Sequence, residues 1–308
     1  MAGAVKAVVL LIGVLLAGAS MACGGSSNSA SPAILEMPVE AEPTRAIEVS
    51  ASIPEATPTP KPAKTKKVVV LDPGHGGDEI GAGRNGVTEK ESNLDMAFRV
   101  EKLLIDAGFD VVLTRRTDAR AAQEIPGFTA TRSDLQARLD IANASDGDLF
   151  VSIHSNGSED LGQRGVETWY DSNRQFAAES LILARLLQSN VLRELRAYGY
   201  AAQDRGLFDG VCFRQREGRC FTLFVIAGAR ATSREEVMRR GGDPEALGFN
   251  GQETIYSRPA NMPAALVELL IITNASDAAV LRDEAGRNAM ARGVAGAITA
   301  FFQTNGGG

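Results

Sequence analysis

The sequence has very little histidine, with only His75 and His154 among 308 residues, and it has three cysteines and one tryptophan. It also lacks an excess of positive charge, since its formal net charge is −6. A chain without a basic patch or stripe is not expected to bind nucleic acid. No Lys/Arg-rich amphipathic stretch indicates a helix that lies on a membrane surface. The apolar run from Val8 to Ala19 is short for a bilayer span, which takes about 20 residues.

Residues 1–22 have the pattern of a secretory signal peptide, with Lys6, an apolar run and small residues ahead of Cys23. The residues around Cys23 resemble a bacterial lipoprotein cleavage site, although Ser20 stands where that motif prefers leucine. Lipidation of Cys23, ordinary cleavage after Ala22 and retention as an uncleaved anchor are three open outcomes. We expect an exported protein, either a lipoprotein anchored to the outer face of the cell membrane or a protein of the periplasm or cell wall.

Residues 23–66 are rich in Pro, Ser and Thr and contain few large apolar residues, which is typical of a disordered tether. The folded part is expected to cover 67–304, followed by a short tail at 305–308. If the protein is exported, Cys212 and Cys220 could form a disulfide that closes a small loop. The alternative is two reduced thiols that pack against their neighbours.

The folded part alternates between buried-strand and amphipathic-helix patterns. A strand at 68–71, a helix ending at Asp106 that Ser92 or Asn93 can cap, and a strand at 109–113 predict a parallel pair with a right-handed crossover. The alternation predicts a single α/β domain with a mixed, mostly parallel central sheet and helices on both faces. Further strands are expected at 149–153, 165–170, 221–226 and 262–272, and further helices at 133–143, 174–197, 233–240 and 277–302.

Both histidines follow predicted strands. His75 lies in Asp72-Pro-Gly-His-Gly-Gly, and His154 ends the strand at 149–153 and precedes Ser-Asn-Gly. Ligands usually bind at the carboxyl ends of the strands of an open α/β sheet. A single histidine in such a position is more often structural than a metal ligand. Because both histidines of the chain occupy equivalent positions, we favour metal binding.

Two imidazoles and one carboxylate form a common catalytic zinc site that leaves a fourth position for water. The expected third ligand is Glu89, in the loop that leads into the helix after His75. Glu91 is two residues away, and spacing alone does not exclude it. The simpler alternative for Glu89 is an exposed residue near a helix start, where its charge is favourable.

Glu268 stands inside the otherwise apolar run of 262–272, where an unpaired carboxylate would be costly. Such a carboxylate is either paired with an arginine or functional. Two strand-end histidines that could reach the same edge of the sheet favour a functional role.

Five segments resemble, in order, the signature segments of the zinc-dependent N-acetylmuramoyl-L-alanine amidases of the third amidase type. The resemblance covers nearly all of 67–304 and implies a cell-wall hydrolase domain with one zinc ion held by His75, Glu89 and His154. It also implies that Glu268 is the general base that takes the proton of the attacking water and returns it to the departing amine. The five segments are Asp72–Gly77, Glu89–Leu94, Arg138–Asn143, Ser152–Asn156 and Met262–Asn274.

The resemblance implies that the substrate is peptidoglycan, cut at the amide bond between N-acetylmuramic acid and L-alanine. The chain differs from the minimal family domain in three longer segments, which are 121–131, the loop from Cys212 to Cys220 and especially 227–261. In addition, Leu269-Leu-Ile-Ile-Thr replaces the Gly-Phe-like residues common after the catalytic Glu. One hypothesis is that 227–261 forms a lid that an activator partner relieves. Two other readings are a restrained peptidoglycan-binding or regulatory lipoprotein on an amidase fold, and another zinc hydrolase on the same fold.

Overall fold

The computed structural model describes residues 64–216 and 219–305, without the side chains of 214–221 and 305. The expected signal peptide, Cys23 and the tether up to residue 63 lie outside these described residues. None of the helices in the described part of the chain is both long and apolar enough to cross a membrane.

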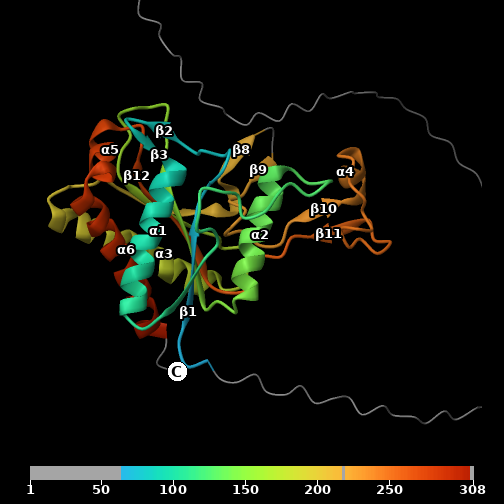
Figure 1. The fold of residues 1–308 in the computed structure, drawn as a ribbon, viewed down its shortest axis with the longest axis horizontal. Helices are drawn as coiled ribbons and strands as arrows, with labels where there is room; N and C mark the ends of the chain where they lie inside the picture. The colour runs from blue at the N-terminus through green and yellow to red at the C-terminus, as the bar shows by residue number, and fades with distance from the viewer. Residues whose placement is uncertain (1–63, 217–218, 306–308) are drawn as a thin grey trace, which may run out of the picture. The chain divides into compact units, whose positions relative to one another are not determined.

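A six-stranded sheet forms the centre of the domain (Figure 1). Only the pair β12–β6 is antiparallel, and the other neighbouring strands run parallel. The prediction of a mixed, mostly parallel sheet is therefore confirmed. In spatial order the strands are β4 (Asp110–Leu113), β1 (Val68–Pro73), β5 (Leu149–Asn156), β12 (Ala264–Ile271), β6 (Val166–Tyr170) and β7 (Asp204–Asp209).

Helices cover both faces of this sheet, as predicted. On one face, side chains of α1 (Glu89–Asp106), α3 (Ala177–Tyr198) and α6 (Glu284–Asn305) form the larger apolar core with the sheet. On the other face, α2 (Ala130–Ala144) contributes Leu139 and Ala142 to a second core. The crossover from β1 through α1 to β4 joins two parallel strands, as the sequence pattern indicated.

Several element boundaries differ from the predictions. The helix after His75 begins at Glu89 and not near Asn93, because Thr88 is its extended N-cap and the acidic first turn suits a helix start. The expected strand at 221–226 is wrong, because residues 222–226 form irregular and turn structure that still buries Val225. The expected strand at 165–170 is largely buried and not half-exposed. The predicted last helix is divided by the extended residue Asp283 into α5 (Ala275–Arg282) and α6.

Three short two-stranded antiparallel sheets lie outside the main sheet. They are β2 (Gly83–Arg84) with β3 (Val87–Thr88), β8 (Arg214–Arg216) with β9 (Arg219–Phe221), and β10 (Ala231–Ser233) with β11 (Thr254–Tyr256). A short 3-10 helix, η1 (Gly210–Cys212), precedes β8. Cys212 is disulfide-bonded, but the side chain of Cys220 lies outside the described residues, so pairing between these two cysteines stays a prediction.

The long segment 227–261 forms a docked arm that packs along α2 (Figure 1). It contains β10, β11 and the short helix α4 (Arg234–Arg239), which confirms the helix expected near 233–240. Arg132 of α2 donates to Thr232 at 2.6 Å, and Asn143 of α2 donates to the carbonyl of Pro259 at 2.9 Å. Side-chain hydrogen bonds therefore hold the arm against α2.

A buried ion pair holds the carboxyl end of β1. Arg138 of α2 lies 2.9 Å from Asp72, and the side chains of both residues are 1% exposed. Arg138 also donates to the carbonyl oxygens of Pro73 and His75, each at 2.7 Å. Although burial alone raises the pKa of a carboxyl group, the charge of Arg138 and the hydroxyls of Thr114 and Ser152 hold the pKa of Asp72 below its usual value.

Replacing Asp72 by asparagine (Asp72→Asn) should lower the free energy of unfolding at neutral pH by about 1.5–3 kcal/mol, because Arg138 loses one of its two buried carboxylate partners and keeps only Asp134, at 2.9 Å. Folding lowers the pKa of Asp72, so its charge stabilises the folded state above pH 3.8 and this contribution is lost as the pH falls further. In urea denaturation, the difference between wild type and variant should therefore shrink in acid.

The matched control is Asp140→Asn, which breaks a more exposed pair with Arg258 and should cost less than about 1 kcal/mol. Equal losses of stability in the two variants would contradict the importance of the buried pair.

Candidate metal centre

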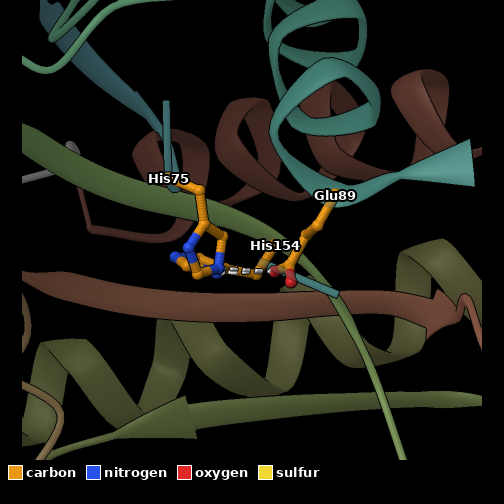
Figure 2. A group of neighbouring side chains, drawn as sticks. All are labelled: His75, Glu89 and His154. Atoms are coloured by element: carbon orange, nitrogen blue, oxygen red, sulfur yellow. Dashed lines mark hydrogen bonds and ion pairs between the residues drawn. The ribbon is translucent and has the colours of Figure 1, made fainter. Parts of the chain in front are cut away.

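Three side chains from distant parts of the sequence converge at the carboxyl ends of β1 and β5. His75 follows β1, Glu89 opens α1 and His154 lies on β5, and Figure 2 shows their polar atoms turned toward one another. Oε1 of Glu89 is 3.0 Å from Nε2 of His75 and 2.9 Å from Nδ1 of His154. One ligand atom from each residue fits within 4.8 Å of the others. The structure thus brings together the three ligands expected from the sequence.

The backbone around His75 is held in an unusual conformation. His75 has φ 61°, a left-handed value that costs a residue with a side chain about 1 kcal/mol or more. Arg138 holds the carbonyl of His75, and Arg115 donates to the carbonyls of Pro73 at 2.8 Å and Gly74 at 3.0 Å. These two buried arginines keep the strained loop in one position and thereby orient the imidazole.

A further carboxylate fixes the ring of His75. Oε1 of Glu79 lies 3.2 Å from Nδ1 of His75, on the side of the ring away from Glu89. A carboxylate in this position holds the proton on Nδ1 and leaves the lone pair of Nε2 for a metal ion. Glu79 is not among the site residues expected from the sequence, although its position four residues after a candidate ligand in a Gly-rich loop is a usable signal.

Glu89 is buried and its second oxygen is also bound. Oε2 accepts a hydrogen bond from the backbone N–H of Ala82 at 2.8 Å, which orients the carboxylate. Glu91, the alternative ligand by spacing, is exposed on the same helix turn, and its carboxylate accepts a hydrogen bond from Thr88. The helix start therefore directs Glu89, and not Glu91, toward the histidines.

The donor set fits a zinc ion. Two ligands about 2.1 Å from a tetrahedral zinc ion lie about 3.4 Å from each other, close to the separations of Glu89 from the two histidines. Burial lowers the pKa of His75, but the carboxylates of Glu79 and Glu89 outweigh it and raise the pKa to about 10. The hydrogen bonds and charges of the two histidines hold the pKa of Glu89 well below its usual range despite its burial. A bound cation would take the place of the shared proton, since metal ligands must be deprotonated.

Glu268 lies directly beside this cluster on the neighbouring strand. In the sheet register it is the partner of His154 on one side and of Glu167 on the other. Its Oε2 is inaccessible to solvent and has no hydrogen-bond partner among the described residues. Burial and the negative charges of Glu89 and Glu167 raise the pKa of Glu268 well above its usual range. A carboxylate in this state can accept and release a proton.

The residues after Glu268 form a bulge. The register advances three residues on β12, from Glu268 to Ile271, for two residues on β5. Leu270 within the bulge has φ 71°, a conformation that glycine adopts without steric cost. The departure from Gly-Phe-like residues seen in the sequence thus falls on a strained backbone position next to the candidate catalytic residue.

Comparison with known proteins identifies the chain's relatives. A family model described as N-acetylmuramoyl-L-alanine amidase matches residues 69–300. LytC of Bacillus subtilis (strain 168), an N-acetylmuramoyl-L-alanine amidase, is 30% identical over 237 residues, which is 77% of this chain but 36% of LytC. AmiA of Escherichia coli (strain K12), named for the same activity, is 29% identical over 249 residues, covering 80% of this chain and 79% of AmiA.

A solved structure shares the fold. The catalytic domain of CwlV, an N-acetylmuramoyl-L-alanine amidase from Bacillus (Paenibacillus) polymyxa var. colistinus, superposes with a TM-score of 0.53 and 28% identity. The match covers 77% of this chain and 98% of that domain. This structural likeness confirms the α/β fold expected from the sequence, in addition to the strand order described above.

The imidazole of His154 leaves no room for a side chain at position 74. A Cβ atom at Gly74 would lie 2.2 Å from Cε1 and Nε2 of His154. Gly74→Ala should displace the ring and weaken zinc binding by roughly tenfold to a hundredfold, as when the support of a metal ligand is removed. Competition with a zinc chelator measures this affinity.

The control is Gly83→Ala, where an added Cβ would meet only Ile80 at 3.9 Å, so zinc affinity should stay close to that of wild type. An unchanged affinity in Gly74→Ala would show that His154 does not take part in metal binding in this orientation.

Proposed function

Because the chain belongs to the N-acetylmuramoyl-L-alanine amidase family, we propose that it is a zinc-dependent hydrolase of the amide bond between N-acetylmuramic acid and the L-alanine of the stem peptide. The observation that carries this proposal is the buried Oε2 of Glu268, which has no hydrogen-bond partner among the described residues, beside the convergent group of His75, Glu89 and His154. That arrangement offers a metal site and a proton acceptor on adjacent strands.

The proposed roles follow from the chemistry of each side chain. His75, Glu89 and His154 would hold the zinc ion, with Glu79 and the N–H of Ala82 orienting two of them. A zinc ion in such a site polarises a carbonyl group and makes water a better nucleophile near neutral pH. The carboxylate of Glu268 would accept the proton of the attacking water and then deliver it to the departing amine of L-alanine. A raised pKa suits this double role, because the group must both take up and give back a proton.

The proposed substrate also determines where the protein must act. Peptidoglycan lies outside the cell membrane, so we propose that the chain is exported through its signal-like residues 1–22. The tether of 23–66 would then connect a lipid anchor on Cys23, or a free N-terminus, to the catalytic domain of 67–304. An activator that acts on the docked arm of 227–261 is part of the same proposal.

Glu268→Gln should keep zinc binding and lose hydrolysis by roughly a hundredfold or more, because it removes the proton acceptor while it preserves the size of the side chain. His75→Ala and His154→Ala should lose bound zinc as well as activity. Elemental analysis gives the zinc content, and mass spectrometry of peptidoglycan digests gives new L-alanine amino termini, with and without a chelator.

Full activity in Glu268→Gln would remove this residue from the mechanism. Binding to intact cell wall with no cleavage by the zinc-loaded wild type would favour the alternative of a restrained peptidoglycan-binding protein. Cleavage of a different amide would indicate another zinc hydrolase on the same fold.

A further inference from the structure

A β-bulge places one arginine beside the candidate site. Val166 of β6 pairs with Asp204 of β7, but the next residue of β6, Glu167, pairs with Gly206, so Arg205 is the extra residue. Bulges between parallel strands are rare, and a bulge re-aims the side chain that it carries. Gly206 has φ 91°, and its N–H donates to the carboxylate of Asp204 at 2.9 Å. The backbone conformation that presents Arg205 is therefore locally stabilised.

Glu167 fixes the direction of this arginine. Nε of Arg205 donates to Oε2 of Glu167 at 2.6 Å. The other oxygen of Glu167 accepts from Asn156 at 2.8 Å and from the indole N–H of Trp169 at 3.2 Å. Glu167 is buried and both its oxygens are bound, so it is a rigid support for Arg205.

The terminal nitrogens of Arg205 are free. Nη1 and Nη2 make no hydrogen bond to any residue in the part of the chain that the structure describes, and the side chain is 21% exposed. By contrast, all three nitrogens of Arg115 and of Arg138 donate to oxygens of the protein. The Nη1–Nη2 edge of a guanidinium group matches the two oxygens of a carboxylate. Arg205 is thus oriented through one edge and open for a ligand on the other.

The position of Arg205 limits which carboxylate it can bind. Glu167 is the register partner of Glu268, and Glu268 is the partner of His154, so these side chains share one face of the sheet. Neighbouring strands lie about 4.8 Å apart, so Glu167 lies about 10 Å from the strand that carries His154. A peptide that extends from the cleaved amide covers this distance with about three residues.

From these contacts we infer that Arg205, supported by Glu167, forms a subsite for a carboxylate on the peptide part of the substrate, within about three residues of the cleaved amide. This inference rests on the proposed amidase function. Arg205 is a specificity-determining residue in this view, and Glu167 is a positioning residue that acts through it.

The test uses two synthetic N-acetylmuramoyl tripeptides that begin with L-alanine and differ only in the carboxylates of their second and third residues. In one substrate these carboxylates are free, and in the other all are primary amides. The zinc-loaded wild-type protein should prefer the free acid by roughly tenfold to a hundredfold in kcat/KM, mainly through a lower KM, as expected for charged hydrogen bonds to a carboxylate.

Arg205→Gln should reduce this preference to about one by raising KM for the free acid, with little change for the amide. Arg205→Lys, which keeps the charge but not the planar edge, should retain part of the preference. Glu167→Gln should lower the same ratio, a readout that a general loss of stability would not change. The matched control is Arg292→Gln on α6. Arg292 also donates through Nε to a glutamate, Glu194 of α3, at 3.0 Å, and neither residue of this pair belongs to the site described above.

The outcomes separate the two proposals. If the zinc-loaded wild type cleaves neither tripeptide nor peptidoglycan, the proposed function fails. If the wild type cleaves both tripeptides with equal kcat/KM, or if Arg205→Gln keeps the preference for the free acid, the amidase function stands and the carboxylate subsite is wrong.

Discussion

The buried ion pair between Arg138 and Asp72 is the constraint on which the candidate site depends. Arg138 comes from α2, and Asp72 lies near the end of β1, shortly before His75. Their contact therefore joins a helix to the carboxyl end of β1. The same guanidinium group holds the carbonyl of His75, whose backbone is left-handed. The buried charge of Arg138 is stable only while it is paired and hydrogen-bonded. Its partners include Asp72 and the carbonyl of His75, so the same contacts fix the backbone that carries His75.

The site contains three glutamates whose chemical behaviour is set by their partners. Glu89 receives hydrogen bonds from both histidines and from backbone N–H groups, and Glu167 is bound by Arg205, Asn156 and Trp169. Glu268 lies between His154 and Glu167 in the sheet register and has one oxygen without a partner among the described residues. Negative charges on both sides disfavour a further charge, which makes Glu268 the carboxylate suited to carry a proton.

The sequence indicated most of the fold, because the buried strands and amphipathic helices have distinct apolar periods. The boundaries were less certain for physical reasons. The helix start at Glu89 was misplaced because Asn93, a good capping residue, instead lies buried inside the helix and donates to the carbonyl of Gly74. The segment at 222–226 is apolar like a strand, but its backbone is irregular and turn-like. It buries Val225 and Ile226 in the second core, and this packing, not the local apolar pattern, determines its conformation.

Local patterns along the chain indicated the candidate residues: two histidines after strands, an acidic residue near a helix start and a carboxylate inside an apolar strand. Those features have local causes and can be read from neighbouring residues. The residue spacing left Glu91 open beside Glu89, and the fold shows that Glu89 faces the histidines and that Glu79, Glu167 and Arg205 surround the site. Contacts of this kind depend on strand register, a bulge and a crossover between distant segments, and no local pattern in the chain records them.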